Sequence, residues 1–248
     1  MTGQLVEITR HPLKGHGREN LACVLLAAGE CLPWDRHWAV AHAAARLQPG
    51  WNPCVNFARA AKAPALMAIT SVLDEARAEL TLTHPEQGRI TFRPDDPQDL
   101  AGFLDWVRPL NPPERAQPAS IVTAGRGMTD SAFASVSILS RASLADLSAR
   151  IGQSLDPARF RGNLWLDGAA PWQEFDWIGR EIRIGGALLK IEERITRCSA
   201  TSLDPATGRS DADTLRALET HFGHQDFGLY ATVLQGGAVA VGDGWGLQ

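Results

Sequence analysis

The chain has 248 residues, of which 44% are hydrophobic, and its formal net charge is −4 at neutral pH. This length allows one large domain or two small ones, and the apolar content suffices for a packed core without disulfide bonds. The negative net charge argues against a nucleic-acid binder, and no apolar run reaches the roughly 20 residues of a membrane-spanning helix. No signal-peptide pattern follows Met1. We therefore expect a cytoplasmic protein with no nucleic-acid partner and no membrane span, in which any anion site is local.

The first half of the chain alternates short apolar runs with glycine- and proline-rich breaks, which is typical of short strands joined by turns. A polar loop over 11–17 contains Lys14 and Gly15, and a turn at 84–88 predicts a hairpin. The segment 97–107 has the spacing of an amphipathic helix. Strands are expected at 4–9, 21–28, 36–43, 63–69, 78–82 and 89–92, although the alanines of 36–43 also suit a helix.

Four prolines between 109 and 118 mark the clearest linker of the chain. It divides the sequence into a β-rich region, residues 1–118, and a second domain, residues 119–248. In the second domain, helices are expected after an N-cap at Ser143 and over 211–222. Strands are expected at 135–139, 163–166, 181–184 and 188–195, followed by a terminal pair at 229–234 and 238–241. Many short strands with few helices predict an α+β fold in which a barrel carries helices on its outside.

Cys198 is the most informative single residue. Arg194 and Arg197 flank it, and cationic neighbours favour the thiolate, which attacks electrophiles or ligates soft metals. The alternative is a buried structural thiol. The other cysteines, Cys23, Cys31 and Cys54, show no CxxC pair or zinc-site spacing, so we interpret them as reduced packing thiols.

A second cluster, residues 159–163, lies upstream of the cysteine. Alternation along an extended segment places Arg159, Arg161 and Asn163 on one face, with Phe160 on the other. Forked guanidinium groups and an amide suit an anion with many oxygens, such as a phosphate. The alternative is a solvated strand edge with weak surface ion pairs.

These motifs, in this order, resemble the MOSC domain, the module named for the C-terminal part of molybdenum-cofactor sulfurase. The first half resembles the β-barrel region that precedes MOSC domains in the mitochondrial amidoxime-reducing components and their bacterial relatives. The second-half resemblance is carried by residues 159–164, 174–179, 182–185, 197–198, 204–205, 207–208, 227–230 and 241–243. The first-half resemblance is carried by residues 10–15, Gly29 and residues 35–38.

The resemblance implies a MOSC-type β-barrel with peripheral helices, preceded by a β-rich subdomain. It also implies that the chain binds the molybdenum cofactor, a molybdopterin carrying Mo, with Cys198 as metal ligand and catalytic residue. The cofactor is expected between the two halves of the chain. The resemblance places Lys14, Arg36, Arg161 and Asn163 on the cofactor, and we expect Gly15 and Arg159 to bind it with them.

The activity implied by the resemblance is an oxidoreductase that reduces small-molecule N-hydroxylated, or related N-oxygenated, substrates. Some bacterial relatives carry a C-terminal ferredoxin-like domain, and this chain ends at Gln248 without one. A separate electron-donor protein, either a reductase or an iron–sulfur protein, is therefore expected. Two alternatives stay open. One is a sulfur carrier or cofactor-maturation protein that uses a Cys198 persulfide. The other is a protein that stores the cofactor without turnover.

Overall fold

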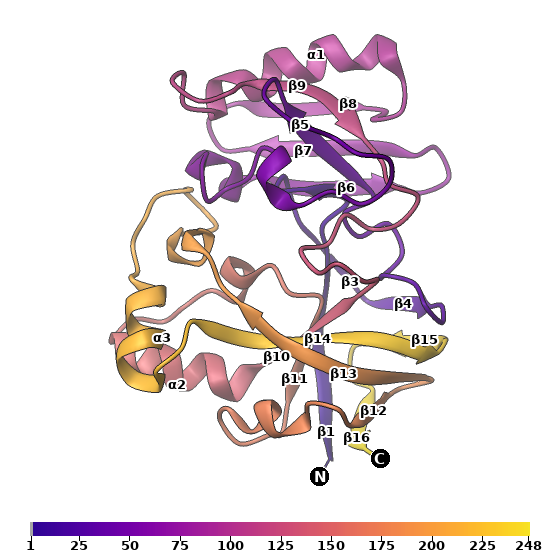
Figure 1. The fold of residues 1–248 in the computed structure, drawn as a ribbon, viewed down its shortest axis with the longest axis vertical. Helices are drawn as coiled ribbons and strands as arrows, with labels where there is room; N and C mark the ends of the chain where they lie inside the picture. Colours follow the sequence, from indigo (N-terminus) through magenta and orange to yellow (C-terminus); the bar gives the residue numbers. More distant parts are fainter. Residues whose placement is uncertain (1) are drawn as a thin grey trace.

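The protein is described by a computed structural model that covers residues 2–248 and has two lobes (Figure 1). The upper lobe in that view contains residues from the first half of the chain. The lower lobe contains most of the second half together with the first strand, and both chain termini lie at its free end.

The lower lobe is a barrel whose ring of strands closes on itself. The strand order is β11-β10-β14-β13-β12-β16-β1, and β1 also pairs antiparallel with β11. Side chains such as Leu5, Ile138 and Leu189 alternate toward its interior and are fully buried. The predicted α+β barrel is therefore confirmed. Its strands are β1 (Thr2–Arg10), β10 (Val136–Ser140), β11 (Leu164–Asp167), β12 (Glu181–Ile184), β13 (Ala187–Thr196), β14 (Asp226–Gln235) and β16 (Gly244–Leu247), with β3 (Glu19–Leu21) beside β1.

Two helices, α2 (Arg141–Ile151) and α3 (Thr214–Phe222), lie together on the outside of the barrel (Figure 1). Leu147 of α2 and Leu218 of α3 are buried in the same hydrophobic cluster. The predicted N-cap of α2 was wrong by one turn, because the Ser140 hydroxyl accepts the hydrogen bond from the Ser143 backbone amide at 3.2 Å. The Ser143 hydroxyl instead donates to the buried carboxylate of Glu174 at 2.8 Å.

The upper lobe consists of two small sheets covered by α1 (Pro97–Val107). Trp38, Leu66, Phe92 and Phe103 fill its core. The strand predicted at 63–69 is wrong: Pro64–Ala68 forms a 3₁₀-helix, with the fixed φ of Pro64 at its first position. The first sheet contains β2 (Leu13–Lys14), β5 (Trp38–His42) and β9 (Pro118–Val122), and the second contains β6 (Thr70–Asp74), β7 (Glu79–His84) and β8 (Gly88–Phe92).

The predicted pairing of the two terminal segments is also wrong. β14 forms antiparallel ladders with β13 on one edge and β10 on the other. The ladder with β10 covers only Leu229–Ala231, and farther along β14 the Val233 carbonyl accepts from the Gly29 amide at 2.9 Å. The segment that follows β14, β15 (Gly237–Ala240), pairs with β4 (Cys23–Leu26) instead. This pairing leaves Cys23 exposed, so its interpretation as a packing thiol was wrong, whereas Cys31 is buried as expected.

The division of the chain between residues 118 and 119 stays a prediction. β1 and β3, from the first 118 residues, pair within the barrel sheet, while β9, which begins at Pro118, pairs with β5 in the upper lobe. Each lobe thus contains strands from both sides of the linker. Within residues 2–248, none of the helices combines the length and the apolar character needed to cross a bilayer.

Glu174, in the 3₁₀-helix Gln173–Trp177, has a buried carboxyl group, and 1% of the surface of the residue is exposed. One of its oxygens accepts from Ser143, and the other, Oε1, has no hydrogen-bond partner within residues 2–248. Burial raises the pKa of Glu174 from 4.5 to about 7, against the opposing hydrogen bond from Ser143. The folded state thus binds more protons than the unfolded state between pH 4.5 and about 7.

The contribution of protonated Glu174 to the free energy of unfolding is therefore fully present below about pH 4.5. It is lost as the pH rises through about 7. We expect Glu174→Gln, which keeps the uncharged form, to match the wild type near pH 4.5 and to be more stable at pH 8. The difference should reach at most about 3 kcal/mol. Thermal unfolding of both proteins across this pH range checks the prediction. A stability difference that does not change with pH would contradict it.

Candidate functional site

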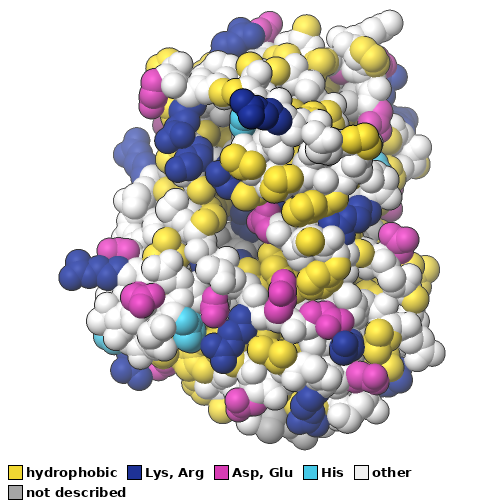
Figure 2. All heavy atoms as spheres, in the orientation of Figure 1, with side chains coloured by type: hydrophobic (Ala, Val, Ile, Leu, Met, Phe, Trp, Pro, Cys, Tyr) yellow, Lys and Arg dark blue, Asp and Glu magenta, His cyan; other side chains and the backbone are white. Residues whose placement is uncertain are grey.

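A cavity of about 250 Å³ lies where the two lobes meet. Figure 2 shows the molecule hollowed at this level, with Lys and Arg side chains gathered above and to the left of the hollow. Six of the seven residues predicted for the site line the cavity, and Asn163 does not. The six are Lys14, Gly15, Arg36, Arg159, Arg161 and Cys198.

Lys14 enters the cavity from β2. Its ammonium group donates to the Met128 carbonyl at 2.6 Å and pairs with Asp130 at 2.5 Å. Burial lowers the pKa of Lys14, while Asp130 opposes the shift.

Gly15, the next residue, has a φ of +78°, and a Cβ built there would lie 2.6 Å from the Ala58 carbonyl oxygen. The loop therefore needs glycine at this position to pass so close to the Ala58 backbone.

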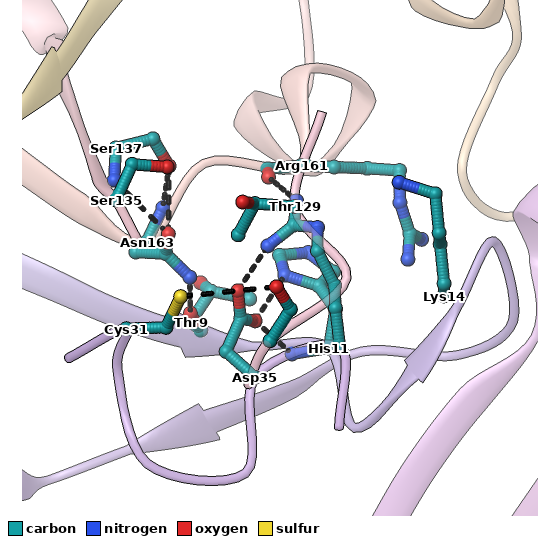
Figure 3. A network of polar contacts seen from close by, with 12 residues as sticks. Thr9, His11, Lys14, Cys31, Asp35, Thr129, Ser135, Ser137, Arg161 and Asn163 are labelled. Atoms are coloured by element: carbon teal, nitrogen blue, oxygen red, sulfur yellow. Dashed lines mark hydrogen bonds and ion pairs between the residues drawn. The ribbon is translucent and has the colours of Figure 1, made fainter. Parts of the chain in front are cut away.

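His11 and Asp35 belong to a buried polar network (Figure 3), and Asp35 also holds Arg36. The Asp35 carboxylate pairs with the Arg36 guanidinium and accepts from the His11 backbone amide at 2.8 Å. Burial would raise the pKa of Asp35, but Arg36 and the hydrogen bonds from His11 outweigh it and lower that pKa. Burial, followed by Arg161 and Arg36, lowers the pKa of His11 to about 3. The carboxylate of this network is thus charged and the imidazole is neutral at physiological pH.

Arg161 lies beside Lys14 at the edge of this network (Figure 3). Its backbone is left-handed, with a φ of +47°, and its carbonyl accepts from Arg36 Nη2 at 2.8 Å. One guanidinium nitrogen donates to the Gly17 carbonyl at 3.2 Å, and Nη1 has no partner within residues 2–248. Burial, Arg36 and Arg18 lower the pKa of Arg161 to about 9. Cations at close range therefore crowd the inner wall of the cavity.

Cys198 lines the same cavity, two residues after β13, at the N-cap of the 3₁₀-helix Ser199–Ser202. Its thiol is exposed. Arg197 also lines the cavity: it donates to the Phe160 and Phe227 carbonyls, but Nη2 has no partner within residues 2–248. Burial lowers the pKa of Arg197 to about 10.

Arg194 is absent from the described lining of the cavity, because its guanidinium lies over the Phe175 ring, 4.1 Å from the ring centroid.

The predicted extended face through Arg159, Arg161 and Asn163 is wrong. Residues Pro157–Phe160 form a 3₁₀-helix, and the left-handed Arg161 ends it, so the three side chains leave the segment in different directions. Arg159 is 3% exposed and forms a forked ion pair with Asp211, with both N–O distances 2.6 Å. Its charge is thus already neutralised at the cavity wall.

Asn163 lies behind the cavity and joins three strands of the barrel (Figure 3). Its amide nitrogen donates to the Thr9 carbonyl at 3.1 Å, and its oxygen accepts from the Ser137 backbone amide and hydroxyl at 3.1 and 2.8 Å. These bonds connect β1, β10 and β11 beneath the loop that carries Arg161. The arrangement gives Asn163 a positioning role rather than a direct contact with a ligand in the cavity.

Sequence reasoning missed several lining residues, including Asp130, Tyr230 and Cys54. Burial, reinforced by Asp130, raises the pKa of Tyr230 to about 12, so its hydroxyl keeps its proton. Cys54 is half-buried, and Arg59 donates to its sulfur at 2.7 Å, so it is not a packing thiol. No local pattern marks these residues, because each comes from a segment distant in the sequence.

The chain is similar in sequence to known proteins over part of its length. The family model described as MOSC domain matches residues 126–244. Mitochondrial amidoxime-reducing component 1 of Homo sapiens is 30% identical over 168 residues, which are 62% of this chain and 48% of that protein. Molybdenum cofactor sulfurase of Anopheles gambiae is 37% identical over 76 residues, which are 30% of this chain and 10% of that protein. The chain thus spans less than half the length of either relative. The YUAD protein of Bacillus subtilis aligns over 100% of this chain and 96% of its own, at 12% identity and a TM-score of 0.49.

Proposed function

Because residues 126–244 match the family model of the MOSC domain, we propose that the chain binds the molybdenum cofactor and reduces N-hydroxylated compounds. The observation that carries the proposal is the pair of buried, unsatisfied guanidinium nitrogens, Arg161 Nη1 and Arg197 Nη2, in one cavity with an exposed thiol. A buried donor without an acceptor is unfavourable, and an anion with several oxygens would satisfy both.

The cavity suits this cofactor in charge and in donor chemistry. Lys14, Arg36, Arg161 and Arg197 outnumber the single lining carboxylate, Asp130, among the described residues of the wall. The cluster is positive although the whole chain carries a net charge of −4. The cationic side chains would hold a phosphate and a pterin ring by charge-assisted hydrogen bonds, and the Cys198 thiolate would ligate a soft metal.

Each residue then has a distinct task. Lys14, Arg36 and Arg161 would bind the anionic end of the cofactor, and the His11–Asp35 pair would keep Arg36 in place. Cys198 would be the protein ligand of the metal. The bound cofactor would supply the two-electron redox chemistry. Tyr230, which stays protonated, would offer a hydrogen-bond donor inside the same cavity.

The proposed substrates are small N-hydroxylated molecules, which the chain would convert to the amine or amidine. A separate electron-donor protein would deliver the two electrons. The names of the curated relatives, an amidoxime-reducing component and a cofactor sulfurase, support this class of chemistry.

We expect the protein, purified from a host that makes the cofactor, to contain about one molybdenum and one pterin per chain, because a thiol and a cationic cluster share one cavity. Elemental analysis and pterin fluorescence measure both. Protein with neither component after gentle purification would contradict the proposal. A persulfide on Cys198 in such protein would favour sulfur transfer instead.

A further inference from the structure

A second cavity, of about 330 Å³, opens next to the candidate site. Its charged lining residues are Arg59, Lys62 and Arg115, and His42 and Asn111 add polar groups. No acidic side chain is among the described residues that line it. We call this cavity the cationic groove. Its volume is in the range of small-molecule sites, and an unbalanced group of cations attracts anions.

Arg59 connects the cationic groove to the site cavity, because it lines both. One of its nitrogens donates to Cys54 Sγ at 2.7 Å, which turns that edge of the guanidinium toward the site. Within residues 2–248, no carboxylate oxygen lies within 4.0 Å of the charged group of Arg59, Lys62 or Arg115. Their positive charges are therefore available to a ligand that reaches from one cavity into the other.

The groove also offers an apolar surface beside its cations. Val55 is 60% exposed, which is unusual for a large aliphatic residue, and it lines the groove next to His42. The His42 Nε2 lies 2.8 Å from the Val55 carbonyl oxygen, and Nδ1 has no partner within residues 2–248. A ligand with an apolar body and an anionic end matches these apolar and cationic groups better than a bare inorganic ion does.

We propose that the cationic groove is a substrate subsite, which selects N-hydroxylated substrates that carry a carboxylate or phosphate away from the reacting nitrogen. The proposal rests on the proposed function. The reacting group lies in the site cavity near Cys198, the apolar body passes Arg59, and the anionic end lies against Lys62 and Arg115. The anion of the cofactor is placed elsewhere, at Lys14, Arg36 and Arg161, so the groove cations are left for the substrate.

The test compares benzamidoxime with 4-carboxybenzamidoxime, a pair that differs in one carboxylate, using reduced methyl viologen as electron donor. We expect the wild type to have the higher kcat/KM for the carboxylated compound. The preference should fall roughly two- to fivefold in Lys62→Gln and in Arg115→Gln, and about tenfold in the double variant, as for partly exposed ion pairs. It should also fall as the salt concentration rises. Arg89→Gln, which removes an exposed arginine on β8 that lines neither cavity, is the matched control.

Equal kcat/KM values for the two compounds in the wild type, or an unchanged preference in the double variant, would overturn the subsite. Loss of pterin from the double variant would also overturn it, because the groove would then bind the cofactor. If neither compound is reduced, the proposed reductase fails. Calorimetric binding of the two compounds then decides the subsite alone, and tighter binding of the carboxylated compound, weakened in the double variant, is the expected result.

Discussion

Cys198→Ala is expected to abolish the reduction of a model amidoxime while the protein stays folded and keeps its pterin. The thiol is exposed in the cavity and makes no structural contact that an alanine would break, since the Cys198 hydrogen bonds to Thr201 involve the backbone carbonyl. The anionic end of the cofactor would be bound by Lys14, Arg36 and Arg161, which the substitution leaves in place. Cys198→Ser should also be inactive or nearly so, because a neutral hydroxyl is a poor ligand where a thiolate is a good one.

Cys23→Ala and Cys31→Ala are the controls, since neither thiol lines the cavity. Both should keep activity, and Cys31→Ala should lose some stability because it removes a buried side chain. Pterin content and turnover are measured on every variant. An active Cys198→Ala protein would remove Cys198 from the chemistry. Cys54→Ala belongs in the same series, because Cys54 lines the cavity and its loss would free Arg59 from its sulfur contact.

Arg161→Ala is expected to lower the affinity for the cofactor at least about tenfold, and cofactor occupancy with it. Loss of a charge-assisted contact corresponds to roughly 1.5–3 kcal/mol, and lysine at this position should restore it only in part because it lacks the fork. The apo protein should be as stable as the wild type or more stable. Burial and two neighbouring arginines already disfavour the Arg161 charge in the empty cavity, as its lowered pKa of about 9 indicates.

Two measurements separate binding from folding in this variant: pterin per chain and the apo-protein Tm. The control is Arg150→Ala, on the exposed face of α2, where the side chain is 51% exposed and pairs with Asp146 at 3.5 Å. Equal pterin content in the two variants would refute the assignment of Arg161. A large fall in the apo Tm of Arg161→Ala would instead show that Arg161 stabilises the fold.

Much of the secondary structure was predictable because it depends on local pattern. The helix predicted at 97–107 has these bounds in α1, whose N-cap Asp96 and following Pro97 are both local signals. The hairpin of β7 and β8 likewise follows from alternation around a turn. The errors occurred where strands distant in the sequence decide which strand a segment pairs with. Residues 237–240 have strand character, but their partner β4 lies far away in the sequence, so only the tertiary structure brings the two strands together.

For the site, the sequence alone indicated the types of residue: a thiol with cationic neighbours, arginines near it, and a lysine in a glycine-containing loop. It could not decide which cations are free. Arg159 and Arg161 look equivalent in sequence, yet Asp211, some fifty residues away, neutralises the first, and the second keeps an unsatisfied nitrogen. Asn163 and Arg194 do not line the cavity, because other contacts hold them. The Asn163 amide donates to a strand carbonyl, and the Arg194 guanidinium lies over an aromatic ring. Cys54 and Tyr230 enter the cavity from distant segments. A side chain's charge and chemistry are properties of the residue, whereas its availability to a ligand depends on contacts that only the tertiary structure brings together.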